Sequence, residues 1–247
     1  MPKIVLKSAS VDFPVFDASA RSLKKRVFRS VVGTTISQRP DGHVVVRGLE
    51  DINFELNDGA RLGLVGHNGA GKTTLLRVLS GIFVPTGGEA TIDGKCVSLI
   101  NISLGIDPEA SGKDNIRLRG VIMGMSPREI AERSDDIAEF TGLGEFLDMP
   151  LRTYSAGMQL RLAFAVSTAV SPEILIMDEW LSTGDAEFQH RANERMRAII
   201  DASNILILAS HSAELIRANC NRVIWLEKGR IKMDGAPDDV LRAYGEQ

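Results

Sequence analysis

Residues 66–73 read Gly-His-Asn-Gly-Ala-Gly-Lys-Thr, which fits the pattern G-x-x-x-x-G-K-[ST] of a phosphate-binding loop. The glycines of such a loop let backbone N–H groups surround phosphate oxygens, while the Lys72 side chain reaches the β- and γ-phosphates and the Thr73 hydroxyl binds Mg²⁺. An apolar run typical of a buried strand precedes the loop, and a helix-compatible run follows it. This order predicts a nucleoside triphosphate site. Its expected residues are Gly66, His67, Asn68, Gly69, Ala70, Gly71, Lys72, Thr73 and Thr74.

Two acidic residues, Asp178 and Glu179, follow a strand-like apolar run. Open α/β sheets place their ligands at the carboxyl ends of strands, so Asp178 is expected to hold the Mg²⁺ whose other ligand is Thr73. Glu179 suits a general base that polarises the attacking water, and His211, after another predicted strand, is expected to contact the γ-phosphate. Acidic pairs and lone histidines at strand ends are otherwise often caps or core residues. The phosphate-binding loop favours the catalytic interpretation here.

Strand-like and helical runs alternate along the chain, which predicts an α/β fold with a largely parallel central sheet. The interval from about 105 to 170 is mostly helical and is a candidate subdomain. Ser126-Pro127-Arg128-Glu129 is a capping box that opens a helix ending near Phe140. Further helices are expected over 73–80, with Gly81 as the C′ residue, and over 237–244. Strands are expected at 52–56, 61–65, 97–100, 174–178, 205–209, 222–227 and 230–233.

Composition limits the class of protein. A chain of 247 residues predicts one large α/β domain or a domain with a subdomain. Lys plus Arg total 29 against 32 for Asp plus Glu, so no overall basic field points to nucleic acid. Cys96 and Cys220 lie in or beside apolar sequence, which predicts two unpaired core thiols in a reducing compartment. Met1–Lys7 shows no secretory signal, and the apolar runs are of strand length.

Residues 19–32 are unusually basic. Ala20, Leu23, Val27 and Val31 are spaced at intervals of three or four, and Arg and Lys fill most of the positions between them. This spacing predicts a basic amphipathic helix. Two interpretations stay open: a solvated surface insertion with one packed stripe, or a helix lying against anionic lipid or a membrane partner.

The order of the phosphate-binding loop, Tyr154-Ser-Ala-Gly-Met158 and Asp178-Glu179 resembles that of ABC-type ATPases over essentially the whole chain. The resemblance implies an α/β P-loop NTPase of ABC type, with a mostly parallel core sheet, an antiparallel β region and a helical subdomain inserted at about 105–170 into a single domain. Ser155 suits the N-cap of an apolar helix running through Val170, where its hydroxyl and the first-turn N–H groups form an anion site. The resemblance also implies that Ser155 and Gly157 complete the ATP site of a second copy, with Asp185 contacting across the interface of that homodimer.

Three stretches are similar to the ATPases of capsular polysaccharide, O-antigen and teichoic acid exporters: Thr153–Met158, Met177–Trp180 with Gly184-Asp185, and Ser103–Ile116. This similarity implies MgATP hydrolysis at the cytoplasmic face of the inner membrane. ATP hydrolysis would power the export of a lipid-linked polysaccharide through a transmembrane permease subunit. The region from about 105 to 150 would bind that subunit. The basic insertion, about 19–40, resembles an extension found in that group. Since the chain stops at Gln247, no carbohydrate-binding domain and no direct glycan binding are expected.

Two positions depart from the general ABC pattern. No Gln lies between the phosphate-binding loop and Ser155, and Asn101 or Ser103 are candidates to replace it. The resemblance implies an aromatic residue against adenine, and Phe13 and Phe16 both qualify. The alternative function is a soluble ABC ATPase acting on DNA or the ribosome. It is disfavoured because the chain lacks coiled-coil heptads, a tandem ATPase domain and a basic nucleic-acid surface, so no nucleic acid partner is expected.

Overall fold

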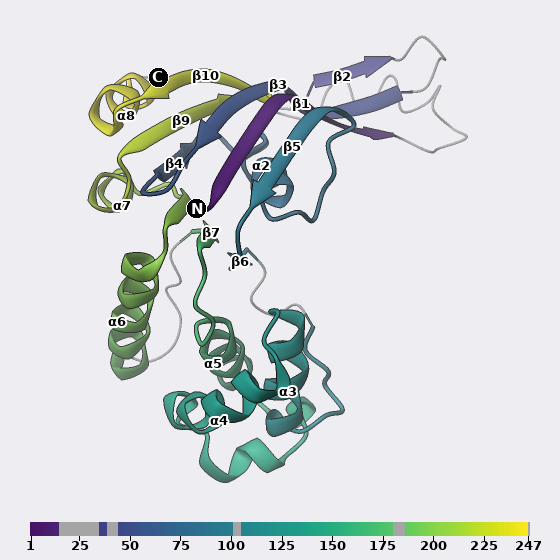
Figure 1. The fold of residues 1–247 in the computed structure, drawn as a ribbon, viewed down its shortest axis with the longest axis vertical. Coiled ribbons are helices and arrows are strands. Elements are labelled where there is room, and N and C mark those ends of the chain that lie inside the picture. Colours follow the sequence, from purple (N-terminus) through teal and green to yellow (C-terminus); the bar gives the residue numbers. More distant parts are fainter. Residues whose placement is uncertain (15–34, 39–43, 101–104, 180–185, 247) are drawn as a thin grey trace. The chain divides into compact units, whose positions relative to one another are not determined.

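The computed structural model describes residues 1–14, 35–38, 44–100, 105–179 and 186–246 (Figure 1). The chain forms two compact units. The first unit consists of Met1–Cys96, Ile174–Glu179 and Asn204–Gln247, and the second of Val97–Glu173 and Trp180–Ser203. The helices expected between about 105 and 170 lie in the second unit. Except for residues 35–38, the basic insertion lies outside the described residues.

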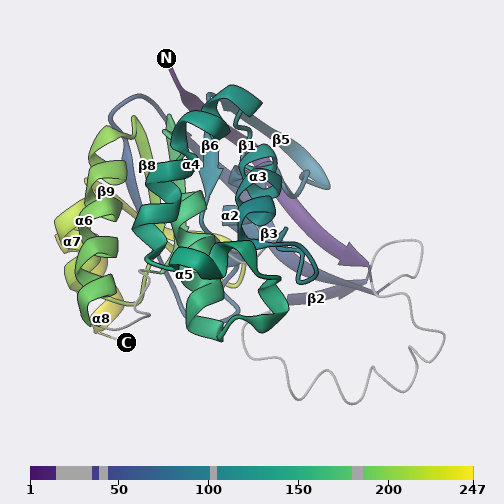
Figure 2. The ribbon, with the colours of Figure 1, turned by 90° about the horizontal axis from the view of Figure 1, so that it is seen from below.

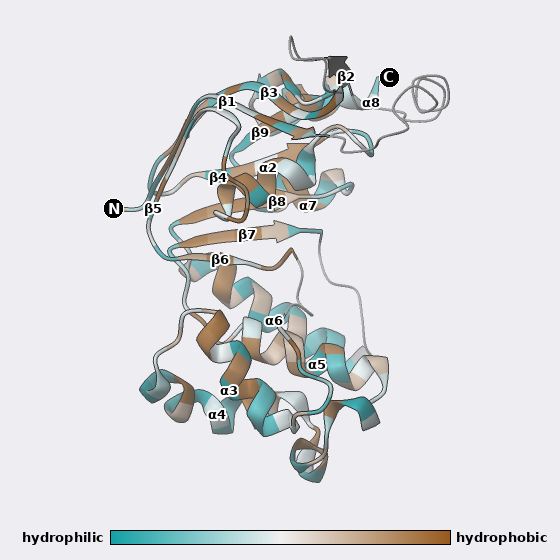
Figure 3. Ribbon diagram, turned by 90° about the vertical axis from the view of Figure 1, so that its right-hand side faces the viewer, coloured by the Kyte–Doolittle hydropathy of each residue, from teal (hydrophilic) through white to brown (hydrophobic). Residues whose placement is uncertain are grey.

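A six-stranded sheet, five of whose strands lie wholly in the first unit, forms the centre of that unit. Its strands, in spatial order, are β10 (Arg230–Gly235), β9 (Arg222–Glu227), β4 (Arg61–Val65), β8 (Ile205–Ala209), β7 (Ile174–Asp178) and β6 (Cys96–Ser98). The four neighbours β9, β4, β8 and β7 pair in parallel, and β10 is antiparallel to β9. Parallel strands covered on both faces read as continuous apolar runs, and Figure 3 shows β4, β7 and β8 as hydrophobic. The predicted α/β fold with a largely parallel core sheet is confirmed.

A second, antiparallel sheet completes the β structure of this unit. Its strands, in spatial order, are β2 (Thr35–Gln38), β3 (Val44–Leu56), β1 (Lys3–Pro14) and β5 (Gly87–Asp93). The strand expected over 52–56 is only the final part of β3, and the other three strands were not predicted individually. In β1 the register shifts between Leu6 and Ala9, and Ser8 has a φ of 46°. This bulge interrupts the alternation by which a strand is found in sequence.

The described residues of the first unit form three helices: α2 (Lys72–Leu79), α7 (Ala213–Asn219) and α8 (Pro237–Gly245). Helix α2 contacts β7 of one sheet and β3 and β5 of the other, so it lies between the two sheets and buries Leu75, Leu76 and Leu79 there. Helix α7 contacts β4, and α8 contacts β9 and β10. Gly81 has a φ of 74° directly after the C-cap Ser80, which confirms it as the C′ residue of α2.

The second unit is helical. Its elements are α3 (Gly112–Ile122), α4 (Pro127–Thr141), the short 3₁₀ helices η1 (Gly144–Asp148) and η2 (Leu151–Thr153), α5 (Ala156–Ser167) and α6 (Ala186–Ala202). Helices α3, α4 and α5 pack against one another (Figure 2). The predicted capping box is confirmed: the Ser126 N–H donates to the Glu129 carboxylate over 2.7 Å, and the Glu129 N–H donates to the Ser126 hydroxyl.

Aromatic stacking attaches α6 to the rest of this unit. The rings of Phe140, Phe164 and Phe188 lie with centroids 5.6–6.0 Å apart, and they come from α4, α5 and α6. The Arg195 guanidinium lies 4.4 Å from the centroid of the Phe140 ring and donates to Asp136 over 2.7 Å. Cation–π and ion-pair contacts therefore hold one face of α6 to α4.

Helix α5 ends at Ser167, although the sequence predicted it to continue through Val170. The hydroxyls of Ser167 and Thr168 donate to carbonyl oxygens of the last turns, and Pro172 follows shortly after. Side chains that bond to nearby carbonyls and a following proline both favour helix termination.

Among the described residues, every helix is too short or too polar to span a membrane.

Both cysteines are free thiols, as expected; Cys220 is buried, whereas Cys96 is partly exposed. Burial raises the pKa of Cys96 to about 11 and that of Cys220 to about 12, so neither is a reactive thiolate at neutral pH.

Candidate functional site

The loop of residues 66–71 connects β4 to α2 and has a backbone that only glycine adopts readily at three positions. The φ angles of Gly66, Gly69 and Gly71 are 151°, 81° and 106°. A Cβ atom on Gly71 would lie 2.8 Å from the carbonyl oxygen of Gly48, and one on Gly66 would overlap the carbonyl oxygen of Leu226. The glycines are therefore required by both conformation and space.

Lys72 folds back over this loop. Its ammonium group donates hydrogen bonds to the carbonyl oxygens of Gly66 and of His67, the latter over 3.3 Å. Burial lowers the pKa of Lys72, and the neighbouring carboxylates of Asp178 and Glu179 act in the opposite direction. The positive charge thus lies at the mouth of a loop whose shape suits phosphate.

Thr73 and Asp178 face each other where α2 meets β7. The Thr73 hydroxyl donates to Oδ2 of Asp178 over 3.1 Å. A hydroxyl and a carboxylate are hard oxygen ligands of the kind that Mg²⁺ prefers, so the two side chains fit the ion predicted for them.

Glu179 and His211 lie together at the carboxyl edge of the parallel sheet. Oε1 of Glu179 is 3.9 Å from Nε2 of His211, and both side chains are at least half exposed. The Glu179 backbone has a φ of 70° and is held by a 2.8 Å hydrogen bond from its N–H to the carbonyl oxygen of Ala209. A non-glycine residue in this region carries strain, which accumulates at functional positions. The structure therefore brings together Lys72, Thr73, Asp178, Glu179 and His211, all within the first unit.

Phe13, near the end of β1, lies beside the start of α2. A Cβ atom on Gly48 would be 2.7 Å from Cε2 of Phe13 and 3.2 Å from Cγ2 of Thr74, so the Phe13 ring covers the Gly48 backbone next to the first turn of the helix. The ring makes an edge contact with Phe83 at 5.6 Å and is 37% exposed. An aromatic surface is thus open beside the phosphate-binding loop.

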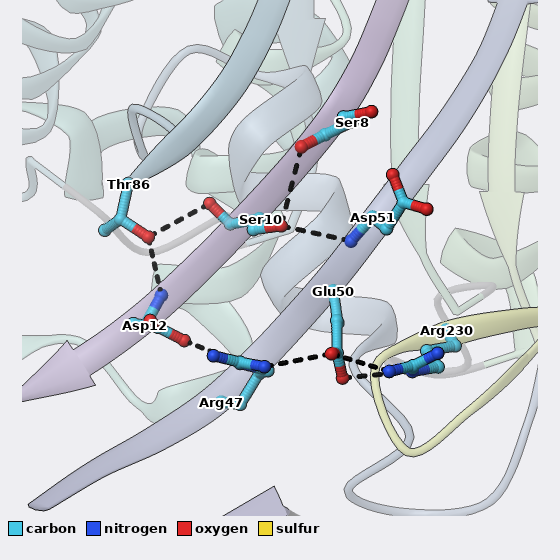
Figure 4. A network of polar contacts seen from close by, with 8 residues as sticks. All are labelled: Ser8, Ser10, Asp12, Arg47, Glu50, Asp51, Thr86 and Arg230. Carbon is cyan, nitrogen blue, oxygen red and sulfur yellow. Dashed lines mark hydrogen bonds and ion pairs between the residues drawn. The ribbon is translucent and has the colours of Figure 1, made fainter. Parts of the chain in front are cut away.

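A chain of ion pairs fixes the strand that carries Phe13 (Figure 4). Arg47 donates to Asp12 over 3.0 Å and to Glu50 over 2.9 Å, and Arg230 donates to Glu50 over 3.0 Å. The hydrogen bond from Arg230 is the main cause that lowers the pKa of Glu50, and the bond to Asp12 is the main cause that raises the pKa of Arg47. The chain links β1, β3 and β10.

The turn of the β9–β10 hairpin contacts the phosphate-binding loop, a contact that the sequence does not predict. Lys228 and Gly229 form its turn with φ angles of 50° and 79°. The Gly229 N–H donates to the carbonyl oxygen of Ala70 over 2.9 Å, and its own carbonyl accepts from the Glu50 N–H over 2.8 Å. A Lys-Gly pair between two strand-like runs signals the hairpin, but it does not reveal these contacts.

In the second unit, Ser155 caps α5 as predicted. Its hydroxyl accepts from the Met158 N–H over 3.2 Å, and both Ser155 and Gly157 are exposed. Asp185, Phe16, Asn101 and Ser103 lie outside the described residues.

Comparisons with known proteins find a matching family and similar chains. A family model described as "ABC transporter" matches residues 49–182. The chain is 42% identical over 231 residues to an O-antigen export system ATP-binding protein of Yersinia enterocolitica, a match that covers 94% of this chain and 97% of the relative. It is 35% identical to an O-antigen export system ATP-binding protein of Myxococcus xanthus and 38% identical to a teichoic acids export ATP-binding protein of Lactococcus lactis. Those matches cover 96% and 91% of this chain, but it spans only 56% and 47% of those two relatives.

Solved structures share the fold. An ATP-binding subunit of an ABC transporter matches with a TM-score of 0.69 and 22% identity, covering 98% of this chain and 93% of that one. A dimeric ATP-binding cassette in a post-hydrolysis state with ADP and phosphate matches with a TM-score of 0.67 and 18% identity, covering 95% and 98%.

Proposed function

The chain belongs to the ABC transporter family, and on this premise we propose that it binds and hydrolyses ATP to power the export of a lipid-linked cell-surface polysaccharide. The observation that carries the proposal is the grouping of Lys72, Thr73, Asp178, Glu179 and His211 at one sheet edge. The relatives described above support a polymer of the O-antigen or teichoic acid type as cargo. They do not favour the alternative of an ATPase acting on DNA or the ribosome.

The chemistry follows from the placement of these side chains. Backbone N–H groups of residues 66–73 and the Lys72 ammonium would bind the β- and γ-phosphates, and Phe13 would stack on adenine. Thr73 and Asp178 would hold Mg²⁺, whose charge would stabilise the phosphate oxygens. Glu179 orients a water molecule and takes its proton as the water oxygen bonds to the γ-phosphorus and the bond to the β,γ-bridging oxygen breaks. His211, 3.9 Å from Glu179, would donate to a γ-phosphate oxygen.

A second copy of the chain is the proposed partner at the nucleotide. The exposed N-terminal turn of α5, with Ser155 and Gly157, offers a hydroxyl and backbone N–H groups to an anion. In an isologous dimer each copy would present this turn to the ATP bound by the other, with Asp185 contributing at the interface.

The second unit carries a surface suited to a transmembrane partner. Five large apolar side chains in this unit are 43–60% exposed. Leu118, Val121 and Ile122 belong to α3, Phe146 belongs to η1, and Met149 directly follows η1. Helix α3 contacts η1, so the two groups lie on adjoining elements. Exposed apolar patches mark interaction sites, and we propose that this docking patch binds the permease subunit and holds the ATPase at the cytoplasmic face of the inner membrane.

The test is to purify the tagged Glu179→Gln protein from its native membranes with MgATP and to identify what accompanies it by mass spectrometry. Recovery of a polytopic membrane protein supports the exporter, and recovery of only ribosomal or DNA-associated proteins contradicts it. A second preparation adds Val121→Asp in the docking patch, which we expect to abolish this recovery. Val84→Asp, at an 82% exposed position of the first unit, is the matched control that should leave it intact.

A further inference from the structure

The phosphate-binding loop touches the last helix of the chain. The His67 ring lies 5.4 Å from the Tyr244 ring of α8, tilted by 47°. Tyr244 in turn makes an edge contact with Trp225 of β9 at 5.4 Å, and the Lys232 ammonium lies 4.0 Å from the centroid of the Trp225 ring. Trp225 is 3% exposed and pairs in register with Val65, the residue just before the loop. Tyr244 is therefore held against a rigid base.

His67 occupies a position from which its side chain affects the shape of the loop. Its carbonyl oxygen accepts hydrogen bonds from the Ala70 N–H over 3.0 Å and from the Lys72 ammonium over 3.3 Å. The Cα of His67 carries both the ring that contacts Tyr244 and this carbonyl, so a shift of the residue would displace the acceptor of both hydrogen bonds. A loop that binds phosphate through its N–H groups must keep those groups aimed inward, so this peptide influences affinity for the nucleotide.

The Tyr244 contact is separable from the anchoring of α8 itself. Val240 and Leu241 fasten the helix to the sheet, and they are 0% and 7% exposed. Tyr244 is only partly buried, and it lies one turn further along. Burial of Val240 and Leu241 stabilises the packing of α8 independently of Tyr244, because it removes apolar area from water.

We propose that Tyr244 is a positioning residue for nucleotide binding: it holds the His67 side chain and so keeps the loop of residues 66–71 in its phosphate-binding shape. Helix α8 thereby sets the affinity for the nucleotide without touching it. This inference rests on the proposed function, since it concerns the same ATP site.

The test is calorimetric titration of the full chain with MgADP. We expect Tyr244→Ala to weaken binding by about three- to tenfold, the range of one aromatic contact, while kcat for ATP at saturation stays unchanged. Tyr244→Phe keeps the ring and should bind as the wild type does. His67→Ala and the double variant His67→Ala with Tyr244→Ala should bind equally, because Tyr244 acts through His67.

Leu241→Ala is the matched control, expected to lower the melting temperature of the protein without changing the Kd for MgADP. Should Tyr244→Ala not fold, Tyr244→Leu, which retains apolar contact with Trp225, takes its place in the series. Wild-type affinity in the ring-deleted variant, or effects of the His67 and Tyr244 substitutions that add, would overturn the inference. Absence of MgADP binding by the wild type would instead overturn the proposed function.

Discussion

The hydroxyl of Thr73 donates a hydrogen bond to Oδ2 of Asp178 across 3.1 Å, although the two residues are 105 positions apart in the sequence. The contact joins the first turn of α2 to the end of β7, and helix and strand pack directly on each other. The two oxygen ligands proposed for one Mg²⁺ ion are thus placed by two different elements. The rigidity of both elements sets the distance between them.

Removal of the Thr73 hydroxyl should impair hydrolysis through the metal. We expect Thr73→Val to lower kcat at least about tenfold and to raise the MgCl₂ concentration needed for half-maximal activity. Thr73→Ser keeps the hydroxyl and is the matched control, with activity near the wild type. ATPase assays over a magnesium series measure both effects. An unchanged magnesium dependence in Thr73→Val would show that this hydroxyl is not a ligand.

Glu179→Gln should separate binding from turnover. The substitution removes the proton acceptor but keeps the size of the side chain, so we expect kcat to fall by about 10²- to 10⁴-fold while ATP is still bound. Glu89→Gln, an exposed carboxylate of β5, controls for the loss of one negative charge. Phosphate release and nucleotide binding are measured on the same samples. Normal hydrolysis by Glu179→Gln would exclude Glu179 as the base.

Phe13→Ala should weaken the binding of the adenine base without weakening the binding of the phosphates. Stacking of a base on an aromatic side chain contributes about 1–3 kcal/mol, so we expect the Kd for ATP to rise by about fivefold or more. Inorganic tripolyphosphate has no base, and its affinity should be the same for wild type and Phe13→Ala. Phe13→Tyr should bind ATP as tightly as the wild type. Equal losses for ATP and tripolyphosphate would mean that the substitution disturbs the loop rather than a stacking surface.

Loss of the Glu50 carboxylate should change how stability depends on pH. Arg230 lowers the pKa of Glu50 in the folded state, so the ionised form stabilises the fold above the unfolded-state pKa of about 4.5, and this stabilisation is lost as the pH falls through the lower folded-state pKa. At pH 7, urea unfolding should therefore show that the free energy of unfolding of Glu50→Gln is lower than that of the wild type by about 1 kcal/mol. This difference in free energy should shrink below pH 4.5. Glu89→Gln, outside this network, should show no such convergence. A constant difference between Glu50→Gln and wild type down to pH 3 would contradict the ion-pair explanation.

Much of the fold follows from local sequence. The interior residues of β4, β7, β8 and β9 are buried and appear as apolar runs, and the boundaries of these strands were predicted to within a residue. The cap of α4 at Ser126 was equally readable, since its two hydrogen bonds lie within four residues of sequence. Features whose energy is local are visible in the sequence.

The remainder depends on partners far away in the chain. β5 reads Gly-Gly-Glu-Ala-Thr-Ile-Asp and is largely exposed, and pairing with β1 defines it as a strand. The supports of the phosphate-binding loop at Gly229 and Tyr244 are also long-range, and no local pattern at these residues indicates the loop they contact. The residues of the loop were predictable, whereas those that hold it in shape were not.

The first unit is assembled from three separate pieces of chain, and this has a consequence for the order in which the protein forms during synthesis. Residues 97–203 include the whole of the second unit. The ribosome therefore synthesises all of that unit before it synthesises β8 and β9. β4 pairs only with those two late strands, so it must wait for them. Pairing over such distances is slow and leaves edges exposed. We therefore expect newly made chains to pass through a stage in which the helices of the second unit are folded and the nucleotide site of the first unit is not.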